Sequence, residues 1–109
     1  MLIKVMEPQT KEQRTIMKLL LAYCSVEKKE FYDVFCQARK RSNLLALYDQ
    51  GQLLGCLLLD VHKNSLVACC LLKDTVFAGE DMKDAIEKVL KPRYPEHKIC
   101  LSMKSYPIS

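Results

Sequence analysis

The spacing of apolar residues changes several times along the chain, and each change predicts a new element. Residues 1–6 are apolar except for Lys4 and predict a short strand, which Pro8 ends. Apolar residues then recur at intervals of three and four over residues 16–23 and again over residues 31–38. This spacing places them on one face of a helix, so we predict two helices after the first strand.

Polar residues mark the expected ends of these two helices. Thr10 and Gln13 have the spacing of a capping box, in which each side chain satisfies a free backbone N–H at the helix start. The first helix is expected to end near Cys24, and Ser25 to cap the second. Three basic residues, 39–41, suit the last turn of the second helix, where positive charge interacts favourably with exposed carbonyls.

The second half of the chain begins with strand patterns. Leucine-rich runs at residues 44–48, 53–61 and 66–72 are separated by Asp49-Gln50-Gly51 and by Lys63-Asn64-Ser65, both of which are typical of turns. These runs predict a three-stranded antiparallel meander. A third helix is expected over residues 79–91, ended by Pro92, and a last strand over residues 98–103.

Composition and length fit one globular domain over residues 1–109, with residues 105–109 as a tail. Half of the 109 residues are apolar and 28% are charged, so the chain is expected to bury one core. No apolar run approaches the roughly 18 residues that cross a bilayer, and no signal-peptide pattern opens the chain. We therefore expect a cytosolic or otherwise intracellular protein without membrane association. The net charge of +4 is mild, and aromatic residues do not interleave with a basic stripe, so nucleic-acid binding is not expected.

The six cysteines lie within apolar, periodic segments, which favours buried thiols over disulfides or metal ligands. Cys69 and Cys70 are adjacent in an expected strand, so their side chains point to opposite faces and do not form a zinc-binding pair. A redox role for them would require exposure and positive surroundings, and their neighbours are apolar. We predict no metal site.

Other polar residues each have a catalytic or binding interpretation and a plainer one. Asp60 and His62 share a strand face and would suit an acid/base pair, or simply a solvated strand end. His97 is expected to be a surface residue of a loop. The basic residues 39–41, together with Lys28 and Lys29, would suit phosphate contacts, or only the charge preference of a helix end.

The predicted order of elements resembles the front two-thirds of the GNAT-type N-acetyltransferase fold. Residues 44–56, Leu-Leu-Ala-Leu-Tyr-Asp-Gln-Gly-Gln-Leu-Leu-Gly-Cys, look like that family's hairpin, in which a polar turn joins a hydrophobic strand to a second strand with an early glycine. The resemblance covers roughly residues 1–103. It implies an α+β fold with a central, mostly antiparallel sheet of about five strands and three helices.

The resemblance also implies where acetyl-CoA would bind. In the family, a glycine-containing loop after the fourth strand holds the cofactor's pyrophosphate through backbone N–H groups at a helix start. If acetyl-CoA binds here, the residues carried over from the family are Leu71, Leu72 and Lys73 for the pantetheine, and Val76, Phe77, Ala78 and Gly79 for the phosphates.

The corresponding segment of this chain departs from the family pattern. It keeps one glycine, Gly79, but lacks the usual arginine or glutamine and the second glycine, and it places Glu80 and Asp81 in the first helical turn. Those carboxylates would repel a diphosphate by an amount on the order of a kcal/mol each, although Lys73 would supply one compensating charge. The family's further helix and two strands, which in many members carry a tyrosine that protonates the leaving thiolate, have no counterpart, and neither Tyr94 nor Tyr106 lies in a matching context.

Two functions therefore stay open. One is a divergent GNAT-like domain that acts as a protein-binding or structural module without efficient catalysis, as expected in a compact phage or plasmid genome. Its partner, another protein or a second copy in a homodimer, would bind at the exposed sheet edge from Ile99 to Met103. The other is a small acetyl-CoA-dependent N-acyltransferase.

Overall fold

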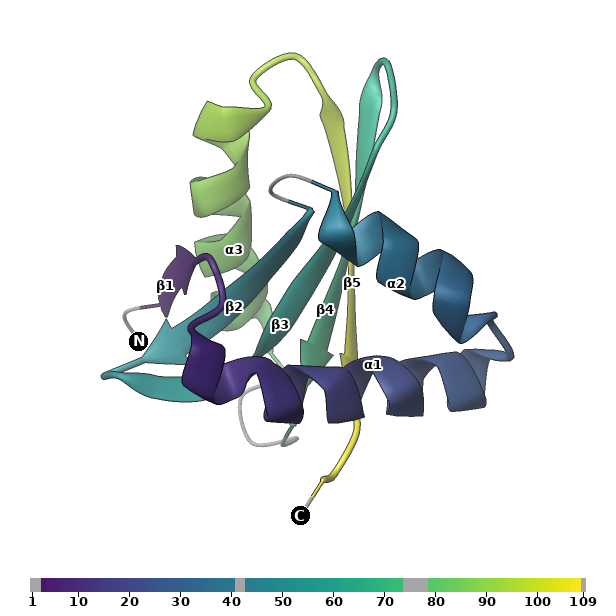
Figure 1. Ribbon diagram of the computed structural model, residues 1–109. Helices are drawn as coiled ribbons and strands as arrows, with labels where there is room; N and C mark the ends of the chain where they lie inside the picture. The colour runs from purple at the N-terminus through teal and green to yellow at the C-terminus, as the bar shows by residue number, and fades with distance from the viewer. Residues whose placement is uncertain (1–2, 41–42, 74–78, 109) are drawn as a thin grey trace.

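The five strands in the described part of the chain form one mixed sheet whose spatial order follows the sequence (Figure 1). The computed structural model describes residues 3–40, 43–73 and 79–108. The strands are β1 (Ile3–Met6), β2 (Leu44–Asp49), β3 (Gln52–Val61), β4 (Ser65–Leu72) and β5 (Lys98–Ser105). The helices are α1 (Gln13–Glu27), α2 (Phe31–Arg39) and α3 (Glu80–Arg93), and a short 3-10 helix, η1 (Thr10–Glu12), precedes α1. The predicted α+β class, with five strands and three α-helices, is confirmed for the described residues.

The first four strands pair antiparallel, each with the next, whereas β5 pairs parallel to β4. The parallel pairing runs without interruption from Ser65 opposite Lys98 to Leu72 opposite Ser105. A parallel neighbour requires a crossover connection, and the segment that contains α3 provides it. The sheet is therefore mostly antiparallel, as predicted, with β1 and β5 at its two edges.

The sheet divides the interior into two apolar clusters, where the sequence suggested a single core. In Figure 1, α1 and α2 lie across one face and α3 covers the other. Side chains alternate between the two faces along each strand, so the leucine-rich runs supply both clusters. From the strands, the α1/α2 side receives Ala46, Tyr48, Leu53, Cys56, Leu58, Cys69 and Leu71, and the α3 side receives Leu45, Leu47, Leu54, Leu57, Leu59, Leu66, Ala68, Cys70 and Leu72.

The hairpin between β2 and β3 has the conformation that its sequence predicts. Asp49 lies opposite Gln52, so the loop consists of Gln50 and Gly51. Both loop residues have positive φ angles, 52° and 79°. This is the pattern of a type I′ turn, whose twist matches that of the flanking strands, and it explains the glycine in the turn.

The helix ends differ from the prediction. The expected capping box at Thr10 and Gln13 is not formed: Thr10 begins η1, and neither η1 nor α1 has a side-chain cap. Ser25 does not cap α2, because α1 continues through it to Glu27. The helix stops where Lys28 adopts a left-handed conformation (φ 55°) and the N–H of Lys29 bonds the carbonyl of Cys24.

Two C-terminal boundaries also differ. Pro92 was expected to end the third helix, but α3 continues through it to Arg93. The expected tail at residues 105–109 is largely part of the fold, because Ser105 ends β5 and the Tyr106 side chain is only 8% exposed. Tyr106 also donates its backbone N–H to the carbonyl of Leu72 (2.8 Å), and Ile108 packs against the cluster below α1.

The helices of the described ranges, 3–40, 43–73 and 79–108, include none that combines the length and the apolar character needed to cross a membrane. The longest, α1, has 15 residues.

A bulge in β3 brings its backbone unusually close to β4. Leu47 lies opposite Gly55, but Tyr48 lies opposite Leu53, so Leu54 has no partner in β2. The carbonyl of Leu54 instead accepts a hydrogen bond from the N–H of Lys73 (3.1 Å). A Cβ atom at position 55 would overlap the carbonyl oxygen of Leu71 and lie 2.9 Å from Cα of Leu72.

We predict that Gly55→Ala lowers the free energy of unfolding by about 3 kcal/mol or more, because only backbone movement in two paired strands can relieve the overlap. Gly79→Ala is the matched control: a Cβ there meets nothing within 4 Å, and its extended φ of −159° suits any residue. Urea unfolding of both variants measures the difference. Equal losses would contradict the close approach at Gly55.

Candidate functional site

At the end of β4, where the family resemblance places the pantetheine of acetyl-CoA, the two leucine side chains are buried in the protein interior. Leu71 and Leu72 are 0% and 1% exposed, and they point into the two opposite clusters. Lys73 is exposed, and Gly79 lies at the start of α3. The other three carried-over residues, Val76, Phe77 and Ala78, lie outside the described residues.

The backbone groups at the end of β4 already have hydrogen-bond partners. The carbonyl of Leu72 accepts from the N–H of Tyr106 (2.8 Å), and the N–H of Lys73 donates to the carbonyl of Leu54 (3.1 Å). The β4–β5 pairing extends to Leu72 itself. A ligand could use the N–H of Lys73 only by displacing the carbonyl of Leu54.

A cavity of about 460 Å³ lies beside this strand end. Among the described residues, its charged lining consists of Lys73 and Asp49, one of each sign, and its other lining residues are Gln50, Gln52, Leu53, Leu54 and Leu72. The hairpin residues 49–52 were not among the predicted site residues. Their position follows from the antiparallel meander, because the start of β3 lies beside the end of β4.

The first turn of α3 is acidic, as the sequence indicates. Glu80 and Asp81 are both exposed, and the helix start has no side-chain cap. The carboxylates interact favourably with the positive end of the helix dipole. They therefore occupy the electrostatic position that a bound phosphate would take.

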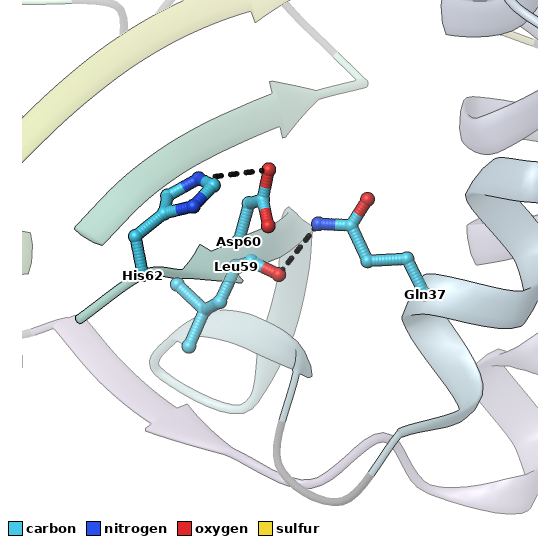
Figure 2. Close-up of polar contacts among 4 residues, drawn as sticks. All are labelled: Gln37, Leu59, Asp60 and His62. Carbon is cyan, nitrogen blue, oxygen red and sulfur yellow. Dashed lines mark hydrogen bonds and ion pairs between the residues drawn. The ribbon is translucent and has the colours of Figure 1, made fainter. Parts of the chain in front are cut away.

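Asp60 and His62 do meet on one strand face, as expected (Figure 2). The Nε2 of His62 lies 3.3 Å from Oδ2 of Asp60, and the two side chains are 53% and 52% exposed. Figure 2 also shows Gln37 of α2, whose Nε2 donates to the backbone carbonyl of Leu59 (2.7 Å). Half-exposed side chains at the end of a strand agree with the plainer interpretation, a solvated strand end.

His97 is more enclosed than a free surface residue. Its ring is half-buried and meets the ring of Tyr94 edge-on, with centroids 5.5 Å apart. Its Nδ1 is buried without a hydrogen-bond partner. In the parts of the chain that the structure describes, no group of three or more histidine, cysteine or acidic residues is arranged to hold a metal ion.

The basic residues near α1 and α2 have local roles. The Nζ of Lys29 lies 5.4 Å from the ring centre of Tyr23, and the guanidinium of Arg39 lies 5.6 Å from that of Phe35. Lys28, Lys29, Arg39 and Lys40 are exposed, and Arg41 lies outside the described residues. For Lys29 and Arg39, these contacts agree with the plainer interpretation, the charge preference of a helix end.

The prediction of buried thiols is confirmed for four cysteines and wrong for two. Cys24, Cys56, Cys69 and Cys70 are buried, whereas Cys36 and Cys100 are exposed. Burial raises the pKa of Cys70 to about 12 and also raises the pKa values of Cys56 and Cys24. Cys69 and Cys70 lie in opposite clusters, as predicted.

The exposure of Cys100 follows from the alternation of side chains along β5. Ile99, Leu101 and Met103 pack against the cluster on the α3 side, so Cys100 and Ser102 point to the other face. The side chains of Cys100 and Ser102 are exposed there. The sequence Lys-Ile-Cys-Leu-Ser-Met-Lys carries this signal, because polar and apolar residues alternate around the cysteine.

The outer edge of β5 is a second candidate site. Among the described strands, only β4 pairs with β5, and the eight residues of β5 make it longer than the four-residue β1 at the other edge. Lys98 and Tyr106 donate their N–H groups toward the β4 side, to the carbonyls of Asn64 and Leu72. Because these groups alternate in direction along a strand, the backbone groups of Ile99, Leu101 and Met103 face outward.

Comparison of this chain with protein-family models and with curated proteins finds no match.

We predict that a thiol reagent labels two cysteines of the native protein rapidly, and the other four at least roughly 100-fold more slowly. Reaction requires an accessible thiolate, and burial removes access to four of the six thiols. Native and urea-unfolded protein are compared by mass spectrometry. The double variant Cys36→Ser, Cys100→Ser should lose the fast phase completely, and a fast phase that survives these changes would contradict the assignment.

Proposed function

We propose that this chain is a divergent GNAT-like domain that acts mainly as a protein-binding or structural module, without efficient catalysis. The observation that carries the proposal is the β4–β5 pairing, which runs to Leu72 opposite Ser105. This pairing engages the backbone that would otherwise hold a pantetheine chain. It also leaves the outer side of β5 as an eight-residue strand edge.

An open strand edge is suited to binding a protein segment. An extended segment can add to such an edge through backbone hydrogen bonds, while side chains on alternate positions give specificity. The outward backbone groups of Ile99, Leu101 and Met103 are suitably spaced for this, and their half-buried side chains offer an apolar strip on the α3 side.

The acidic start of α3 further supports a module without catalysis. Glu80 and Asp81 would each oppose a diphosphate by an amount on the order of a kcal/mol, which together corresponds to roughly 30-fold in affinity. Lys73 lines the nearby cavity together with Asp49, which offsets its charge.

The alternative function is a small acetyl-CoA-dependent N-acyltransferase. The cavity of about 460 Å³ beside Lys73 favours this alternative, because it is within the range of volumes that small-molecule sites occupy. If the cofactor bound the N–H of Lys73, the carbonyl of Leu54 would have to release its hydrogen bond.

Calorimetric titration with acetyl-CoA distinguishes the two functions. We expect no binding by the wild-type protein at micromolar concentrations. The double variant Glu80→Gln, Asp81→Asn removes both carboxylates, so any residual affinity should increase by roughly 30-fold. Asp84→Asn, Glu87→Gln is the matched control, because it makes the same charge change farther along α3 and should leave the affinity within a fewfold of the wild-type value.

Micromolar binding by the wild-type protein would overturn the proposal and direct attention to amine substrates. Binding by the Glu80→Gln, Asp81→Asn variant alone would identify an inherited site closed by two carboxylates, in support of the proposal. Absence of binding by all three proteins also supports it.

A further inference from the structure

We propose that the partner at the outer edge of β5 is β5 of a second copy of this chain, paired antiparallel with Ser102 at the two-fold axis. This inference rests on the proposed function, because it names the partner of that module. In this dimer, the five-stranded sheets of the two copies join into one continuous sheet.

Symmetry fixes the direction of the pairing. Two identical edges related by a two-fold axis run antiparallel, because each residue must make the same contact in both directions. The N–H groups of Lys98 and Tyr106 point toward β4, so the odd-numbered residues of β5 present their backbone groups to the partner. Hydrogen-bonded pairs across the interface therefore join odd-numbered residues to odd-numbered residues.

Charge then selects the register. Two registers that satisfy this rule overlap β5 over nearly its whole length: one is centred on Leu101 and the other on Ser102. The register centred on Leu101 places Lys98 opposite the partner's Lys104, twice by symmetry, and like charges directly opposite each other are destabilising. The register centred on Ser102 places Lys98 opposite the partner's Tyr106 and Cys100 opposite the partner's Lys104.

The environment of Lys104 agrees with this choice. Its Nζ lies 2.6 Å from Oε1 of Glu27 on α1, and in the register centred on Ser102 no second cation lies opposite it. The carboxylate of Glu27 raises the pKa of Lys104 through this contact. The Lys104 side chain is thus directed toward α1. In the register centred on Ser102 it lies opposite the neutral Cys100 of the other copy, so no like charge faces it.

The apolar side of β5 is self-complementary in the same register. Ile99, Leu101 and Met103 form a half-buried strip at the margin of the α3 cluster. With Ser102 at the axis, Leu101 lies opposite the partner's Met103, and the reverse contact follows by symmetry. Because antiparallel pairing keeps each face of the sheet on the same side, both α3 helices lie on one side and the two strips join.

Disulfide crosslinking tests the register directly. The variant Cys36→Ser, Cys100→Ser removes the two exposed thiols, and Ser102→Cys in this background adds one at the two-fold axis. Residues facing each other there form a non-hydrogen-bonded pair with Cα atoms about 4.5 Å apart, which a disulfide can span. We expect rapid formation of a covalent dimer with oxidised glutathione.

The matched control, Cys36→Ser alone, retains Cys100 as its exposed thiol. In the proposed register, the two Cys100 residues are offset by four positions along the strands, about 13 Å, which is too far for a disulfide. Its crosslinking should be at least roughly tenfold slower than that of the Ser102→Cys variant. Equal or faster crosslinking through Cys100 would overturn the register.

Sedimentation tests the pairing without thiols. Leu101→Ala and Leu101→Pro both remove the leucine side chain. Only proline also removes the outward N–H, and because this N–H does not bond to β4, the β4–β5 pairing stays intact. We expect the alanine variant to retain dimers and the proline variant to be monomeric, with circular dichroism confirming that both fold. Equal dimer content in the two variants, or a monomeric wild-type protein at about 100 μM, would overturn self-pairing. The acetyl-CoA titration still tests the proposed function separately.

Discussion

The parallel pairing of β5 with β4 is the interaction on which the rest of this structure depends. It fills the position beside β4, occupies the carbonyl of Leu72 with the N–H of Tyr106, and draws the C-terminal segment against the cluster below α1. Because β5 covers the buried, leucine-rich β4, the edge of the sheet is formed by β5 instead. The exposed face of β5 carries polar side chains. One set of backbone hydrogen bonds thus engages the end of β4 at one place and leaves β5 as the edge of the sheet at another.

Much of the fold could be predicted because its elements are locally encoded. The leucine runs of β2, β3 and β4 are bounded by turn residues, and Gly51 marks a hairpin whose geometry requires a positive φ angle. The end of α1 was harder to predict, because Lys28 adopts the left-handed conformation without being glycine or asparagine. The burial of Tyr106 could not be predicted locally, because it depends on the neighbour that β5 selects in the sheet.

The candidate sites show the same division. The acidic residues Glu80 and Asp81 and the contact between Asp60 and His62 follow from spacing along single elements. The occupied backbone of Leu72 and Lys73 does not, since its hydrogen-bond partners come from β5 and from the bulge at Leu54. The two exposed thiols could also have been predicted from local patterns. Alternation along β5 indicates the exposure of Cys100, and the apolar spacing of α2 places Cys36 on the helix face opposite its apolar stripe.

The crossover through α3 also has a consequence for the order of folding. The contacts among β2, β3 and β4 join neighbouring segments, whereas the β4–β5 pairing joins strands that α3 separates along the chain, so we expect it to form last. Until then β4 is itself an edge strand, and its sequence, Ser-Leu-Val-Ala-Cys-Cys-Leu-Leu, has neither a charged residue nor a proline. Such a strand is a template for aggregation. In the folded protein β5 covers this edge of β4, and slow formation of the β4–β5 pairing would leave the edge open to misassembly.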